Sequence, residues 1–178
     1  MLMEPTPTSA PVTTTAVGIR YGLLAGVASI IFSLLLFMTS ADQSPVRWLG
    51  LAITIGAMVL AHNQFKQHNG GFMSYGQGLG IGTLLVVVSG VISTVFSYLY
   101  MTYMDPGYMG RIMEKTRLEM EAKGNMSDAQ VDQAMAMAQK FSSGAWMLLF
   151  GILGSILIGF VISLIISAFT KHNRPEFD

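Results

Sequence analysis

One uncharged stretch, from Gly70 to Pro106, constrains the fold of this chain more than any other feature. It begins at the helix-breaking pair Gly70-Gly71 and contains no lysine, arginine, aspartate or glutamate before Asp105. It ends at Asp105-Pro106, because a proline ring disfavours helix in the residue before it. About thirty residues of helix span about 45 Å, whereas the hydrocarbon core of a bilayer is about 30 Å thick. The stretch therefore predicts a helix that crosses a membrane.

The composition of the whole chain agrees with a membrane protein. Of its residues 52% are hydrophobic and 11% are charged, whereas about a quarter of the residues of a soluble domain are charged. Basic and acidic residues number 10 each, so no net field attracts nucleic acid, and we expect no nucleic-acid partner. Cysteine is absent, which excludes disulfides, thiolate metal sites and cysteine nucleophiles.

Three further apolar stretches complete the predicted membrane domain, which covers residues 16–171. The four predicted spans are residues 17–38, 48–65, 75–104 and 145–170. Residues 1–15, rich in threonine and proline, are predicted to be a disordered tail, and residues 172–178 a short polar tail. A cleaved signal peptide is the alternative for the first span, but its apolar run exceeds the usual length of about 7–15 residues and no basic residue precedes it.

The only long polar block lies between the third and fourth spans, at residues 105–144. Met109, Ile112, Met113 and Met120 recur at helical spacing, which predicts an amphipathic helix. Gly124-Asn125 is a typical helix end, and Ser127 with Gln130 is typical of a capping box that starts a second helix. The block therefore predicts an amphipathic helical hairpin, lying either on the bilayer interface or on the ends of the spans.

Small residues four positions apart occur on every predicted span. Such residues let helix backbones approach closely in lipid, so they predict tight packing within one four-helix bundle. The alternatives are a glycine-lined path and a dimerisation face. Tyr21-Gly22 with Gly26 also matches Tyr75-Gly76 with Gly80, which would suit a parallel duplication of a two-span unit. The sets are Gly18, Gly22 and Gly26; Ala52 and Gly56; Gly76 and Gly80; Gly78 and Gly82; and Gly151, Ser155, Gly159, Ser163 and Ser167.

Four spans return both termini to one side of the membrane. Basic residues counted in the short connections alone place the termini in the cytoplasm, whereas counting the hairpin block reverses the result. We predict cytoplasmic termini.

Few ionisable residues lie within the predicted spans. Arg20 and His62 each lie toward the end of a span. We interpret both side chains as anchors at the membrane interface, and the alternative is a part in a proton relay. His62, His68 and His172 are scattered without a carboxylate partner, which argues against a shared metal site. The sequence predicts no catalytic, cofactor-binding or metal-binding residues, and no cofactor.

Two residue patterns have chemical alternatives. Fourteen methionines would suit Cu(I), which prefers thioether ligands. However, they mostly follow helical spacing on apolar faces, which predicts ordinary packing; these are Met101, Met104, Met109, Met113 and Met120. The glycine run from Gly76 to Gly82 lacks the lysine of a phosphate-binding loop. The best candidate pair for an enzyme acting on lipid is Asp105 with Tyr108. A simple turn accounts for these two residues equally well, so we expect no enzyme.

Several motifs together resemble one known family. They are Ile19 to Gly26, Gly70 to Gly78, Met104-Asp105-Pro106, the Ser127 to Phe141 helix and the Gly159 to Phe169 end. In this order they resemble the bacterial membrane proteins grouped as domain of unknown function 4199, over about Ala16 to Lys171. The resemblance implies four spans and the inner membrane of Gram-negative bacteria, and brings no activity. The tail before Ala16 departs from the usual short start of that family.

The sequence thus predicts an all-α integral membrane four-helix bundle with an amphipathic hairpin between its third and fourth spans. The predicted function is a non-enzymatic membrane component that assembles through its helix interfaces and its hairpin, with itself or with a membrane-protein partner. The alternative is a small transporter or channel subunit.

Overall fold

The computed structural model describes residues 12–42, 44–142 and 144–174, and their regular elements are all helical. A 3-10 helix at Pro45–Trp48 leads into α2, and a π-helix at Tyr100–Met104 extends α3. The α-helices are α1 (Thr14–Met38), α2 (Leu49–His68), α3 (Tyr75–Leu99), α4 (Tyr108–Lys123), α5 (Asp128–Phe141) and α6 (Gly144–Thr170).

Four of these segments are long and apolar enough to cross a membrane, at Thr14–Met38, Pro45–His68, Tyr75–Met104 and Gly144–Thr170. Their bounds follow the predicted spans closely. The second is longer than predicted, because its polar end up to His68 remains helical. The predicted disordered tail falls largely on residues outside the described ranges. Its last two threonines nevertheless belong to α1, where the Thr13 side chain caps the helix by accepting a hydrogen bond from the Ala16 amide at 3.1 Å.

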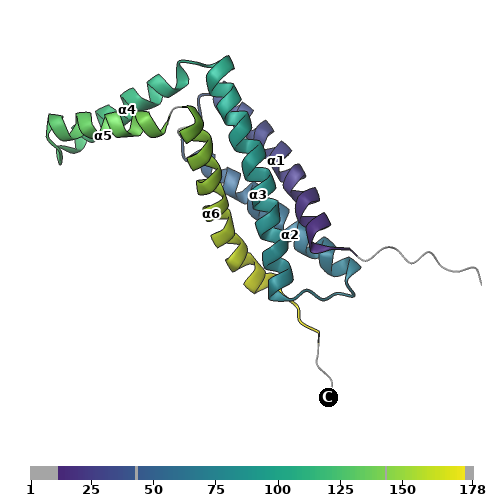
Figure 1. Cartoon of the computed structure of the whole chain (residues 1–178). Helices are drawn as coiled ribbons and strands as arrows, with labels where there is room; N and C mark the ends of the chain where they lie inside the picture. The colour runs from purple at the N-terminus through teal and green to yellow at the C-terminus, as the bar shows by residue number, and fades with distance from the viewer. Residues whose placement is uncertain (1–11, 43, 143, 175–178) are drawn as a thin grey trace, which may run out of the picture.

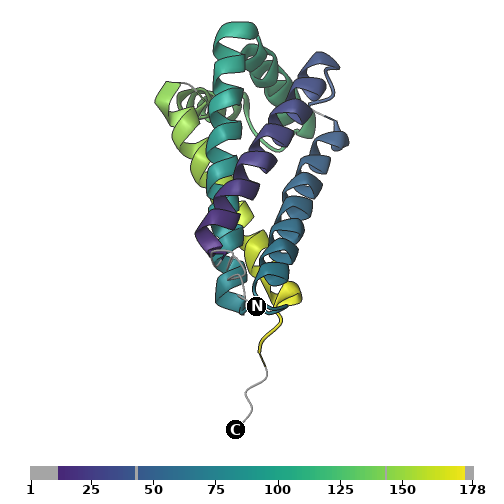
Figure 2. The same ribbon diagram turned by 90° about the vertical axis from the view of Figure 1, so that its right-hand side faces the viewer.

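Helix α3 lies at the centre of the four long helices and contacts α1, α2 and α6 (Figure 1). Turned by 90°, Figure 2 shows α1 and α2 beside α3. The start of α1 and the end of α6 lie at the same end of the molecule (Figure 1). There, Met73 and His172 exchange two backbone hydrogen bonds of 2.8 Å. The pair α4 and α5 leaves the opposite end and extends sideways.

Glycines of α1 allow its close approach to α3. A Cβ atom built on Gly22 would lie 2.8 Å from the Val88 Cβ and 2.9 Å from the Leu85 carbonyl oxygen. Gly18 and Gly26 are similarly crowded, by Leu84 and by Ile92. These three glycines confirm the packing predicted from their spacing.

Along the whole contact between α3 and α6, each turn of helix places a small residue of one helix against the other. Gly78 faces Ser167 and Gly82 faces Ser163, while one helix turn further Gly159 faces Val86. Gly90 faces Ser155, and Gly151 faces Thr94. The row of small residues predicted on the fourth span thus packs against α3.

Other small residues pack against nothing. A Cβ atom at Gly56, Gly76 or Gly80 would meet no atom within 4 Å, so their predicted packing within the chain is wrong. Gly76 and Gly78 differ by two positions, or about 200° around a helix, so only one of them can face α6. The packing does not repeat between the two halves of the proposed duplication. Gly22 lies against α3, whereas its matched residue Gly76 has no neighbour within 4 Å.

Helices α4 and α5 contact each other and run in opposite directions (Figure 1). Gly124 adopts the left-handed conformation with φ 62° and ends α4, as predicted. Ser127 and Gln130 form the predicted capping box at the start of α5. The local signals for both helix ends are therefore confirmed.

Candidate functional site

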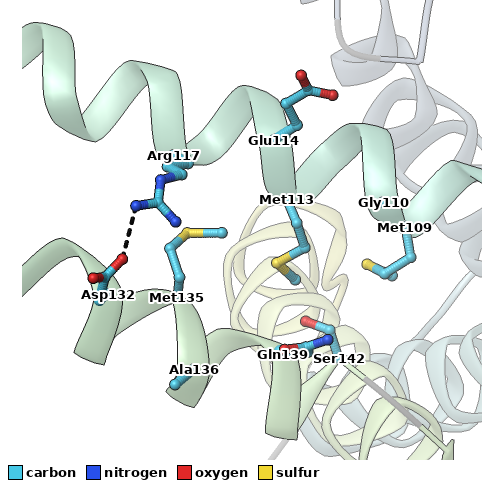
Figure 3. Close-up of a pocket in the computed structure, with 10 residues that line it drawn as sticks. All are labelled: Met109, Gly110, Met113, Glu114, Arg117, Asp132, Met135, Ala136, Gln139 and Ser142. Carbon is cyan, nitrogen blue, oxygen red and sulfur yellow. Dashed lines mark hydrogen bonds and ion pairs between the residues drawn. The ribbon is translucent and has the colours of Figure 1, made fainter.

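A groove of about 650 Å³ lies between α4 and α5 (Figure 3). Apolar, polar and charged side chains from both helices line it. Its lining residues are Met109, Gly110, Met113, Glu114, Arg117, Asp132, Met135, Ala136, Gln139 and Ser142.

Arg117 bridges the two helices beside the groove. Its Nη2 donates to Asp132 Oδ1 at 2.7 Å, and its Nε donates to Glu121 Oε1 at 2.8 Å. The hydrogen bond to Glu121 and the charge of Asp132 raise the pKa of the guanidinium, which therefore stays charged. The bridge is exposed, so it stabilises the hairpin little and mainly orients the two helices.

Three methionine thioethers lie in this groove. Met109 and Met113 come from successive turns of α4, and Met135 comes from α5 (Figure 3). All three side chains are half-buried. They lie on the inner faces of both helices, as the predicted amphipathic pattern requires.

The opposite side of α5 carries exposed apolar side chains. Met137 is 57% exposed and Phe141 is 42% exposed. At 100° per residue both lie on the side of α5 away from Asp132 and Gln139, which line the groove. The Phe141 ring packs edge-on against Trp146 and Phe150 of α6, at 6.2 and 5.2 Å. An apolar surface therefore continues from α6 onto α5.

Asp105 and Tyr108, the residues considered for lipid chemistry, form side-chain contacts that hold the start of α4 in place. The Tyr108 hydroxyl donates to Asp42 Oδ2 at 2.7 Å, and Arg111 forms an ion pair with Asp105. Burial, followed by the hydrogen bond to Asp42, raises the pKa of Tyr108. Its phenol is therefore a stable donor at neutral pH. The Asp105 carboxylate and the Tyr108 hydroxyl bond to different side chains, and Arg111, the partner of Asp105, also lies over the Tyr108 ring at 5.9 Å. These contacts are structural, which supports the turn interpretation.

His62 is not an interface anchor, because the structure buries it completely among α2, α3 and α6. The Gly78 carbonyl accepts a hydrogen bond from its Nε2 at 2.9 Å, and its Nδ1 lies 2.8 Å from the Thr170 Oγ1. Sequence reasoning missed this role, although a signal was present. Met58, Ala61, His62 and Phe65 follow the spacing of one helix face, and all four are buried.

The three histidines have different surroundings. His68 is exposed, with Nδ1 at 2.9 Å from the Gln64 carbonyl oxygen, and the His172 ring stacks on Phe72. Within the described ranges no group of three histidine, cysteine, aspartate or glutamate residues could hold a metal ion. Arg20 lies on the exposed side of α1.

A second cavity, of about 260 Å³, lies near the middle of the four long helices. Hydroxyls from all four of these helices line it: Ser29, Thr54, Ser89, Ser93 and Ser155. Ser155 donates to the Ile152 carbonyl at 2.9 Å and Ser89 to the Val86 carbonyl at 3.4 Å. Their oxygen atoms retain acceptor capacity, although most of the cavity's lining is apolar and includes Leu51, Ile158 and Ile162.

A protein-family model matches the chain over residues 20–172. No curated protein and no solved structure matches the chain significantly. The matched range includes the α4 and α5 groove, the His62 contacts and almost all of the four long helices. The chain therefore belongs to the family described as protein of unknown function (DUF4199), the family that its sequence motifs resemble.

Proposed function

We propose that this protein is a non-enzymatic component of the bacterial inner membrane that holds a partner protein in the groove between α4 and α5. The four long helices span the bilayer as a bundle with cytoplasmic termini. The α4 and α5 hairpin then lies on the opposite, periplasmic surface. The observation that carries this proposal is the groove of about 650 Å³, lined by thioethers and charges and open at one end of the molecule.

The exposed edge of α5 supports the hairpin's position on the bilayer. Met137 and Phe141 continue the apolar surface of α6 through Trp146 and Phe150. Tryptophan and other aromatic side chains are enriched at membrane interfaces, and an apolar helix edge buries itself in the headgroup region. With this edge in lipid, the groove on the other side of α5 faces water.

Open small residues support assembly within the membrane. Gly56 on α2 and Gly80 on α3 have no atom within 4 Å of a built Cβ. Close approach of a second helix is favoured at such positions. They offer a partner helix the same kind of contact that α1 and α6 make with α3.

Photocrosslinking in native membranes tests partner binding. A benzophenone amino acid at Ala136 lies in the groove, whereas one at the neighbouring Met137 lies on the apolar edge. We expect Ala136 to give one discrete protein adduct and Met137 to give lipid adducts. The bulky variant Ala136→Trp should abolish capture of that same protein by the tagged chain, whereas Gln133→Trp on the exposed side of α5 should not. No discrete protein adduct from Ala136, or the same adduct from Met137, contradicts the proposal.

The cavity near the middle of the four long helices favours a second candidate, a carrier of small neutral polar molecules. Transporter sites typically lie near the bilayer midplane, and the hydroxyls of this cavity come from the central part of each helix. If the protein is a carrier, proteoliposomes should take up labelled glycerol faster than empty liposomes. Thr54→Leu should slow that uptake at least tenfold by filling the cavity, whereas Thr39→Leu outside it should not. Equal uptake by proteoliposomes and empty liposomes contradicts a glycerol carrier.

A further inference from the structure

We propose that Met109, Met113 and Met135 form a binding site for one soft monovalent metal ion, Cu(I) or its analogue Ag(I). Ion binding needs only the groove, so it does not depend on the docking of a partner protein. The site uses thioether ligands alone, which is consistent with the absence of cysteine from the chain.

The three thioethers lie along one groove, from which flexible side chains can be brought together on one ion (Figure 3). Met109 and Met113 are four residues apart and therefore lie on one face of α4, one turn from each other. Met135 approaches from α5, on the facing side of the same groove (Figure 3). Thioether sulfur is a soft ligand that selects Cu(I), and methionine side chains are flexible enough to converge on an ion.

The charges that line the groove are largely paired or directed away from the thioethers. Of the two carboxylates, that of Glu114 points away from the three sulfur atoms, and that of Asp132 is paired with Arg117 (Figure 3). The Arg117 guanidinium is bound to Asp132 and to Glu121, so its charge is balanced at the rim. Three thioethers are neutral ligands, so they suit a monovalent ion better than an ion of higher charge.

The exposure of these methionines differs from that of a packed core. Val131, the buried residue of α5, is 1% exposed. Met109, Met113 and Met135 are instead half-buried around open space. An ion can therefore reach their sulfur atoms from water without displacing the packed contact between the helices.

Silver binding by the full chain tests the site. The purified protein in detergent and chloride-free nitrate buffer is titrated with Ag(I) and followed by calorimetry and native mass spectrometry. The groove variant replaces Met109, Met113 and Met135 by leucine. The control variant replaces Met38, Met126 and Met137, which are exposed outside the groove. Exchange of methionine for leucine conserves volume and usually costs less than about 1.5 kcal/mol, so both variants should fold, as circular dichroism will report.

We expect wild type and control variant to bind one Ag(I), and the groove variant to bind at least 100-fold more weakly. Thioethers carry no proton to displace, unlike histidine or carboxylate ligands, so the affinity should change less than about threefold between pH 7 and pH 5. X-ray absorption of the Cu(I) complex should show sulfur neighbours. Absence of Ag(I) binding by the wild type, or equal binding by the folded groove variant, overturns the proposal. Crosslinking from Ala136 in metal-chelated membranes reports partner docking separately.

Discussion

Replacing Gly159 by valine is expected to lower the free energy of unfolding by about 3 kcal/mol, the upper part of the range for overpacked interiors. A Cβ atom at Gly159 would lie 2.6 Å from the Val86 Cγ2 and 2.8 Å from the Val86 Cβ. Val86 belongs to the buried core at 4% exposure, and its Cβ is fixed to the α3 backbone, so rotation of its side chain cannot relieve the whole clash. The added methyl groups would force α6 away from α3 along the whole row of small residues.

Gly154→Val is the matched control, since the same substitution on the same helix meets no atom within 4 Å. It should change stability by no more than about 0.5 kcal/mol, as is usual for open positions. Unfolding by a denaturing detergent, followed by circular dichroism, measures both variants. Equal stabilities of Gly159→Val and Gly154→Val would show that α3 and α6 are not in this contact.

His62→Ala is expected to cost about 3 kcal/mol of unfolding free energy, because it leaves a cavity and removes two hydrogen bonds. The Gly78 carbonyl would lose the donor at 2.9 Å, and Thr170 Oγ1 would lose its contact at 2.8 Å. Since His62 joins α2 to both α3 and α6, the loss should loosen all three helices at that end.

His68→Ala is the control for this change, because His68 is exposed and contacts only its own helix. Its effect should stay within about 0.5 kcal/mol. Thermal unfolding in detergent micelles will rank wild type, His68→Ala and His62→Ala. If the two alanine variants unfold together, the buried contacts of His62 do not stabilise the fold.

Local signals in the sequence predict the elements of this protein well. The charge-free stretch ending at Asp105-Pro106 matches Tyr75–Met104, and Gly124 with Ser127 correctly separates α4 from α5. These features depend on length, hydropathy and capping, which act within a few residues. The four-residue spacing of small residues likewise predicts that α6 has a close neighbour.

Pairing between helices is harder to predict, because it depends on which side of each helix faces which neighbour. Gly76 and Gly78 look equivalent in sequence, yet only Gly78 contacts α6. Likewise, the methionine spacing predicts an apolar face on α4 but not that Met135 lies across a groove from Met109 and Met113. Predicting the contacts of His62 would have required knowing that Gly78 of α3 and Thr170 of α6 both lie next to His62 in the fold.

The separation of α3 from α6 along the chain has a consequence for biosynthesis. A chain is made from its N-terminus, so α3 enters the membrane while its partner surface on α6 is still unmade. Until Thr170 and His172 emerge, His62 and Met73 lack the contacts that join them to the C-terminal helix. Premature termination before α6 would therefore leave Gly78, Gly82 and Gly90 facing lipid. Such a truncated product would therefore expose a row of small residues that α6 covers in the finished protein.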